Sequence, residues 1–140
     1  MSDIIAIATK TPSVNQVYGT FVIPSKIKGK RPTIIRGMKT EFKNVKKEIE
    51  RQLFSINTSK FDKYKEKKSF VTLGVHGNWH NKDGSVKKKD IANYEKFITD
   101  TVFEYLGLKD QFIFKYYLIK VQSETEGFVL DIDFIEGETE

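Results

Sequence analysis

The stretch that decides the fold is residues 69–106, SFVTLGVHGNWHNKDGSVKKKDIANYEKFITDTVFEYL. Its first eight residues alternate, with Val71, Leu73 and Val75 on one face, which predicts a half-buried strand over 69–76. Residues 77–89 are polar and contain an Asp-Gly turn, which predicts a loop. A helix is then expected over 90–106, ended by a glycine, on an apolar stripe made of Ile91, Tyr94, Ile98, Val102 and Tyr105.

Further elements are expected on both sides of this unit. Upstream lie two strands, over 3–9 and 17–23, then a basic loop. A helix with Thr40 as its cap follows, because apolar residues recur at steps of three and four at Phe42, Val45, Ile49 and Leu53. Residues 57–68 lack a sustained apolar face and are expected to form an exposed, Lys-rich connection.

Downstream, residues 112–121 and 128–135 are expected to be strands joined as a hairpin, with Gly127 in the bend. The order β-β-α-β-α-β-β predicts an α+β fold, in which two main helices pack on a mixed β-sheet. Residues 1–140 are expected to form a single domain, with 136–140 as a frayed acidic tail.

Composition narrows the class of protein. The chain has 140 residues, of which 39% are hydrophobic and 13% aromatic, enough for one core. The absence of Cys excludes disulfides, thiol catalysis and Cys-based zinc sites. No apolar run approaches the roughly 20 residues of a membrane span, and residues 1–10 do not have the pattern of a signal peptide. A cytoplasmic protein with no membrane partner is therefore expected.

Charge is divided unevenly along the chain. Residues 1–89 contain 20 Lys and Arg against 7 Asp and Glu, whereas residues 90–140 contain 4 against 12. Since 21 of the 24 basic residues are Lys, the basic half offers point charges rather than planar groups that read bases. This balance favours a polyanion bound through its phosphates; the alternative is a Lys-rich surface that only keeps the protein soluble.

Several isolated polar side chains give weaker signals. His76 and His80 are separated by a glycine and an asparagine, so no helix holds them on one face as zinc ligands. Trp79 is interpreted as an aromatic that anchors its loop, with a base-stacking platform as the alternative. Asp131 and Asp133 alternate with apolar residues and are interpreted as the solvent face of a strand, although paired carboxylates can hold a metal.

The clearest chemical signal is the stretch Lys87-Lys88-Lys89-Asp90-Ile91-Ala92-Asn93-Tyr94-Glu95-Lys96. Three lysines precede a carboxylate at a predicted helix start, and Asn93 and Lys96 follow on the same face. Asp90 is interpreted either as an N-cap or as a Mg²⁺ ligand whose negatively charged substrate is steadied by Lys96. Asp110, beyond the helix, is either a turn residue or a second carboxylate that meets Asp90, if the next strand pairs beside the helix start.

These features resemble the RusA-like Holliday junction resolvases, small endodeoxyribonucleases common in phages and prophages, over most of the chain. Thr11-Pro12-Ser13-Val14-Asn15 is similar to the Pro-Ser-x-Asn turn that follows the first strand of that family. Residues 87–96 are similar to its basic lead into Asp-x-Asp-Asn-x-x-Lys, and Leu106-Gly107-Leu108-Lys109-Asp110 is similar to its helix exit toward an Asp-Asp pair. Lys120 stands where the next strand of the family carries a Lys.

Two positions depart from the family pattern. Ala92 stands where the family has the second aspartate of Asp-x-Asp-Asn, and Lys109 stands where it has the first of its Asp-Asp pair. The loss at Ala92 removes a negative oxygen ligand from a site that neutralises a divalent cation. The resemblance therefore implies a chain that folds and binds DNA but cleaves it poorly, through a substitution that is either natural or introduced.

The resemblance implies a phage-derived homodimer in the host cytoplasm that binds four-way or branched DNA and cuts it by Mg²⁺-dependent phosphodiester hydrolysis, with Mn²⁺ as a substitute. The implied catalytic positions are Asp90, Ala92, Asn93, Lys96 and Asp110, with Asp90 and Asp110 as the metal ligands. The implied DNA contacts are Asn15, Lys87, Lys88 and Lys89. Two alternatives remain: a non-catalytic DNA-binding module in which Asp90 is only a cap, and a protein-interaction domain whose basic half meets an acidic partner.

Overall fold

The chain folds into a sheet covered by helices, with a separate two-stranded ribbon. The computed structural model describes residues 2–12, 18–23 and 25–138. In chain order the elements are β1 (Asp3–Ile7), β2 (Tyr18–Ile23), β3 (Thr33–Met38), α2 (Thr40–Phe54), the 3-10 helix η1 (Thr58–Tyr64), β4 (Ser69–Gly77), α3 (Ala92–Leu106), the 3-10 helix η2 (Asp110–Phe112), β5 (Ile113–Gln122) and β6 (Gly127–Phe134).

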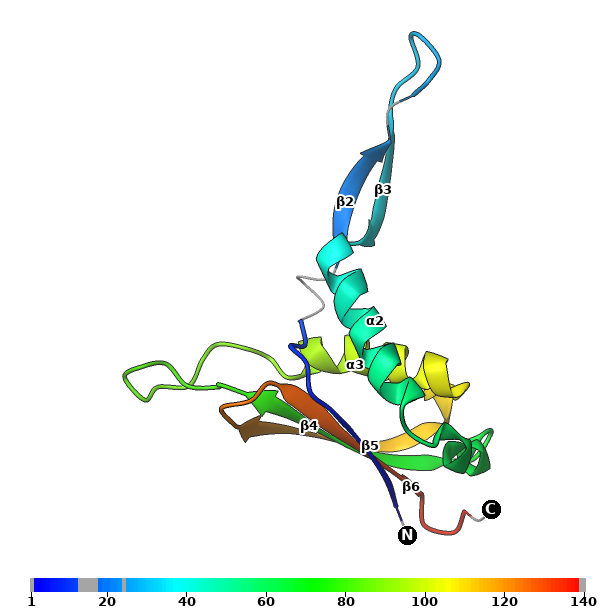
Figure 1. Cartoon of the computed structure of the whole chain (residues 1–140), viewed down its shortest axis with the longest axis vertical. Coiled ribbons are helices and arrows are strands. Elements are labelled where there is room, and N and C mark those ends of the chain that lie inside the picture. The colour runs from blue at the N-terminus through cyan, green and yellow to red at the C-terminus, as the bar shows by residue number, and fades with distance from the viewer. Residues whose placement is uncertain (1, 13–17, 24, 139–140) are drawn as a thin grey trace.

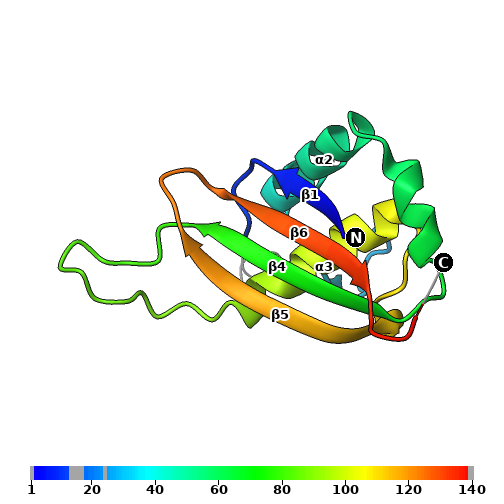
Figure 2. The ribbon, with the colours of Figure 1, turned by 90° about the horizontal axis from the view of Figure 1, so that it is seen from below.

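Four of the strands form one mixed sheet in the order β1-β6-β4-β5. Strand β4 pairs antiparallel with β6 and parallel with β5, and β1 pairs antiparallel with β6. Helices α2 and α3 lie on one face of this sheet, and the opposite face is uncovered (Figures 1 and 2). The predicted α+β architecture, two main helices on a mixed sheet, is confirmed.

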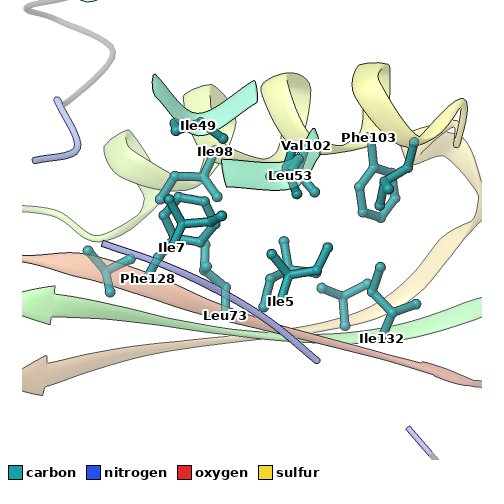
Figure 3. Packing of buried hydrophobic residues seen from close by; sticks show 14 of the residues in the cluster. Ile5, Ile7, Ile49, Leu53, Leu73, Ile98, Val102, Phe103, Phe128 and Ile132 are labelled. Carbon is teal, nitrogen blue, oxygen red and sulfur yellow. The ribbon is translucent and has the colours of Figure 1, made fainter. Parts of the chain in front are cut away.

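The core lies between the sheet and the two helices (Figure 3). Burial alternates along β4, and Val71, Leu73 and Val75 are the buried set, as their alternation predicts. Five residues of the predicted apolar stripes are buried, among them Ile49 of α2 and Ile98 of α3, both fully. The other four are partly buried and pack against the core: Phe42, Val45, Ile91 and Tyr105. Each such side chain contributes about 1.5–3 kcal/mol through burial, so this face of the sheet fixes the position of α3.

The predicted hairpin between the last two strands is wrong. Strand β4 pairs with both β5 and β6 and therefore lies between them. Gly127 is the first residue of β6 rather than a bend, and a Cβ there would lie 2.3 Å from the carbonyl oxygen of Ile7. The glycine thus permits the close approach of β1 and β6, a requirement set by a partner strand more than 100 residues away in sequence.

The expected exposed connection over 57–68 is also wrong in part. Residues 58–64 form η1, which buries Phe61 and Tyr64. The hydroxyl of Tyr64 lies 2.6 Å from Oδ2 of Asp3, and Nζ of Lys63 lies 2.9 Å from the same oxygen. Burial raises the pKa of Tyr64, and the hydrogen bond to Asp3 raises it further. Tyr64 and Lys63 thus tie the connection to Asp3 of β1.

Three further differences concern strand β3, the start of α2 and the C-terminal tail. Strand β3 falls within what was expected to be loop, and it pairs with β2 as a ribbon outside the main sheet. The helix capped by Thr40 in the prediction instead has Lys39 at its N-cap, with no side-chain cap bond. Of the acidic tail, residues 136–138 form a turn in which the Glu138 N–H donates to the Ile135 carbonyl at 2.9 Å; residues 139–140 lie outside the described residues.

Candidate functional site at the start of helix α3

The carboxylate of Asp90 caps the first turn of α3. Its Oδ1 accepts a hydrogen bond from the Ala92 backbone N–H at 3.0 Å, and its carbonyl accepts one from Asn93 N–H at 3.1 Å. The helix accordingly begins at Ala92, two residues later than expected. Among the described residues nothing bonds to Oδ2 of Asp90, so one carboxylate oxygen is available at a helix end that favours negative charge.

The other predicted residues of this stretch lie on the first turns of the same helix. Lys96 is exposed and forms an ion pair with Asp100 at 3.3 Å. Asn93 is half-buried, whereas the side chain of Ala92 is exposed. Because Ala92 faces solvent, a longer polar side chain at this position would meet no packed core.

The three lysines before α3 lie on the return half of the loop that joins β4 to α3. The Lys87 N–H donates to the Trp79 carbonyl at 2.8 Å, and His80 and Val86 form an isolated antiparallel bridge. Lys88 and Lys89 are exposed. The loop extends away from the sheet before it returns to the helix (Figure 2), so these lysines lead directly into Asp90.

Asp110 lies in η2, beside α3 rather than at its first residue. It lines an open cavity of about 500 Å³ with Thr99 and Asp100, and a second of about 260 Å³ with Glu95 and Thr99. Asp90 lines neither of these two cavities. The structure therefore places Asp110 next to the middle of α3, whereas Asp90 lies at its start, about one and a half helical turns before Glu95.

The oxygen donors of this region match Mg²⁺ in kind but are few. Mg²⁺ is commonly held through one or two carboxylates, with water and substrate phosphates completing its shell. Asp90 and Asp110 are two such carboxylates, and Oδ2 of Asp90 is open. Across residues 2–12, 18–23 and 25–138 no group of three or more His, Asp or Glu side chains is arranged to hold a metal ion. Ala92, between Asp90 and Asn93, is exposed and its side chain offers no oxygen.

A separate cavity of about 120 Å³ joins four segments that are distant in sequence. It is lined by the segment after β1, by the end of β4, by the start of α3 with the lysine before it, and by Glu126, which precedes β6. Its polar lining is Lys10, Thr11, His76, Asn78, Lys89 and Glu126. Thr11 is buried, and it directly precedes Pro12, the first residue of the predicted Pro-Ser-x-Asn turn. Asn15 of that turn lies outside the described residues.

Trp79 anchors the loop after β4, which confirms its structural interpretation. The side chain is buried, and its Nε1 donates to the Val75 carbonyl at 3.1 Å. Its ring meets the Tyr94 ring of α3 edge-on, with centroids 5.5 Å apart, and Lys120 Nζ lies 5.0 Å from its centroid. Burial raises the pKa of Tyr94, so the phenol stays neutral. Because Lys120 lies over Trp79, and Trp79 contacts Tyr94, Lys120 is at the same end of the sheet as the start of α3.

The two histidines lie close to this anchor. His76 lines the same cavity as Lys10 and Lys89. The Nδ1 of His80 lies 2.8 Å from Oε1 of Gln122, and the same oxygen accepts the Trp79 backbone N–H at 2.9 Å. The side chain of Gln122 therefore fixes the first residues of the loop, a role with no sequence signal because Gln122 ends a strand 42 residues later.

Two residues that the sequence did not single out support α3 over β5. Oγ1 of Thr99 lies 2.7 Å from the hydroxyl of Tyr116, and burial raises the pKa of Tyr116 although the hydrogen bond with Thr99 opposes this. Thr99 is four residues beyond Glu95, so both lie on the helix face toward Asp110. That spacing is a signal that sequence reasoning could have used; the position of Tyr116 depends on strand pairing.

Comparison with models of known protein families returns no match for this chain, and comparison with curated proteins returns no similar sequence. No helix in the described ranges is both long and apolar enough to cross a bilayer.

Proposed function

We propose that the chain is a RusA-like, structure-specific endodeoxyribonuclease that binds four-way or branched DNA junctions. The observation that carries the proposal is the small cavity at which the segment after β1, the end of β4 and the start of α3 meet. Two of these segments resemble the family's motifs or adjoin them: residues 10–11, at the Pro-Ser-x-Asn turn, and residues 89–94, in the basic stretch. They meet there although they are about 80 residues apart. Lys10 and Lys89 outnumber the one carboxylate of the cavity lining, Glu126, so the cavity has a net positive charge, which favours a DNA phosphate.

In this proposal the residues at the start of α3 and Asp110 of η2 have different roles. Asp90 and Asp110 hold Mg²⁺, or Mn²⁺ in its place, and Asn93 gives a supporting polar contact. When bound, the ion supplies positive charge that stabilises the transition state of phosphodiester hydrolysis. Lys96 adds a cation on the same helix face, and its contact with Asp100 keeps it near the helix surface. Lys87, Lys88, Lys89 and Asn15 contact DNA.

The alanine at position 92 limits the activity of this chain. An exposed alanine has no oxygen to offer, and one oxygen of Asp90 is taken up by the Ala92 N–H. With a carboxylate missing, Mg²⁺ loses a charged ligand and is held more weakly. The proposed activity is therefore junction binding with slow cleavage, in the cytoplasm of a host cell that supplies the DNA.

A non-catalytic DNA-binding module is the second candidate, and the cap at Asp90 favours it. A carboxylate that accepts a backbone N–H at 3.0 Å already has a structural reason to be present. In that function the lysines bind phosphates and no cation is needed. The two candidates share the DNA surface and differ only in metal binding and cleavage.

The proposal includes a homodimer, and we place its interface on the uncovered face of the sheet (Figure 2). Ile119 is 46% exposed and Tyr117 is 50% exposed on this face. Phe70 pairs with Lys115 of β5 on one side and with Asp133 of β6 on the other, so the three lie in one row. A two-fold axis along β4 would set Lys115 of each copy over Asp133 of its partner, which makes the face self-complementary.

A comparison of four-way junction with linear duplex tests the binding part of the proposal. The two DNAs have equal length of duplex and are titrated by gel shift at one fixed salt concentration, without metal, so cleavage does not interfere. We expect the junction to be bound at least tenfold more tightly than the duplex. Equal affinities would contradict the proposal and would favour a general polyanion-binding domain.

A further inference from the structure

The ribbon formed by β2 and β3 stands apart from the rest of the fold. Its register runs from Tyr18 opposite Met38 to Ile23 opposite Thr33, and neither strand pairs with the main sheet. Figure 1 shows the ribbon projecting beyond the first turn of α2, on the side of the sheet that carries both helices. Six paired residues extend it by about 20 Å. It is an arm rather than part of the core.

The arm carries only positive charge. Residues 18–38 contain five basic residues and no Asp or Glu: Lys26, Lys28, Lys30, Arg31 and Arg36. Four of the five lie in the tip, residues 25–32, where every side chain is exposed. In the described part of the chain no carboxylate lies within ion-pair distance of these four, whereas Lys46, Lys63 and Lys65 each have one.

The tip turns through a defined backbone bend. The Lys30 N–H donates to the Ile27 carbonyl at 3.1 Å, and Oγ of Ser25 accepts the Ile27 N–H at 3.2 Å. Gly29 has φ +86°, which the turn requires and other residues rarely adopt. The bend therefore places Lys28 within the turn, with Lys26 and Lys30 on its two sides.

We propose that the β2–β3 arm is a second DNA contact, which binds the phosphate backbone of duplex at a distance from the site on α3. The inference rests on the proposed function, since it requires that the chain bind DNA. A two-stranded ribbon fits the roughly 12 Å width of the major groove. The tip has three lysines and one arginine but no Asn or Gln, and this composition suits phosphates rather than base edges. The arm and α3 lie on the same side of the sheet, so one duplex can meet both (Figure 1).

An anionic membrane is the other polyanion surface that such a tip could meet, and the residues favour DNA. Interfacial segments bury a continuous apolar face in the bilayer boundary. Apart from one proline, the only apolar side chain in 25–32 is Ile27, which is 60% exposed. A single isoleucine among four cations offers no such face.

The test compares the salt dependence of DNA binding in three full-length chains. The arm variant carries Lys26→Gln, Lys28→Gln, Lys30→Gln and Arg31→Gln. The matched control removes the same charge from exposed lysines on α2, on η1 and beside it: Lys47→Gln, Lys60→Gln, Lys65→Gln and Lys68→Gln. A 30-base-pair duplex is titrated from low to physiological salt, and circular dichroism confirms that all three chains fold.

We expect the slope of log K against log salt to decrease by 3 to 4 in the arm variant, because each phosphate contact contributes about 0.9. The control should change it by less than 1. If the unchanged chain binds duplex steeply and the arm variant binds with the same slope, the arm is not a DNA contact, although the proposed function stands. If the unchanged chain does not bind DNA, the proposed function and the inference about the arm are both contradicted. Arm-dependent binding to phosphatidylserine vesicles without any arm-dependent binding to duplex would also overturn the inference.

Discussion

Asp90 has two roles that single substitutions can separate. Its Oδ1 caps α3 through the Ala92 N–H, and its charge would attract a cation. Asn keeps a capping oxygen and removes the charge, whereas Ala removes both. We predict that the unchanged chain binds Mn²⁺ in a calorimetric titration and that Asp90→Asn does not, although it keeps the same thermal midpoint. Asp90→Ala should lose the metal and also about 1 kcal/mol of stability. Equal Mn²⁺ binding by the unchanged chain and Asp90→Asn would show that this residue is only a cap.

At this scale the sequence located one half of the candidate site. Residues three and four apart share a helix face, so the grouping of Asp90, Asn93 and Lys96 followed from local geometry alone. The neighbours of Asp110 did not follow, because they depend on how the chain returns after α3. The structure places this residue beside Glu95 and Thr99 in one cavity. Whether the two carboxylates share a metal stays a prediction.

Among the elements, the contact between β1 and β6 depends on a glycine. A Cβ at Gly127 would lie 2.3 Å from the Ile7 carbonyl oxygen, whereas a Cβ at Gly77 would meet nothing within 4 Å. We predict that Gly127→Ala lowers the free energy of unfolding by about 1–3 kcal/mol through overpacking. Gly77→Ala is the matched control and should change it by less than about 0.5 kcal/mol. Urea unfolding measures both; equal midpoints for the two variants would refute the close approach of these strands.

Elements with a strong period were predicted well, and those defined by distant partners were not. The alternation of apolar residues predicts strand β4, and their recurrence at steps of three and four residues predicts helices α2 and α3. The sequence does not predict that β5 and β6 are separated, because it does not show with which strand each of them pairs. In the structure β4 lies between them. Segment η1 was not predicted, because its two buried aromatic residues, Phe61 and Tyr64, are too few in a Lys-rich run to define an apolar face.

For the molecule as a whole, the uncovered sheet face predicts the oligomeric state. We predict that the chain sediments as a dimer and that Ile119→Glu converts it to a monomer, because the new charge is buried against the partner's sheet. Phe54→Glu is the control, since Phe54 is 83% exposed at the end of α2 and lies away from this face. A monomeric unchanged chain, or a dimer that survives Ile119→Glu, would contradict this interface.

Charge is also organised at the level of the whole molecule. The excess of Lys and Arg in residues 1–89 lies partly in the arm tip and partly in the lysines that lead into α3, both on the helix side of the sheet. The acidic excess that follows includes Asp131 and Asp133 on the uncovered face. Other acidic residues of this half, Glu95, Asp100 and Glu104, lie on α3. The sequence revealed the imbalance, and the fold shows that carboxylates are present on both sides of the sheet.

The central claim is that the start of α3 is a nuclease site that lacks one carboxylate, and restoration of that carboxylate tests it most directly. Ala92 is exposed, so Ala92→Asp adds an oxygen ligand without disturbing the core, and Ala92→Asn adds a side chain of the same size without charge. The measurement is the rate of Mg²⁺-dependent cleavage of a labelled four-way junction by the three chains. We predict that Ala92→Asp cleaves faster than the unchanged chain by orders of magnitude and that Ala92→Asn does not. Equal rates for all three chains would contradict the claim.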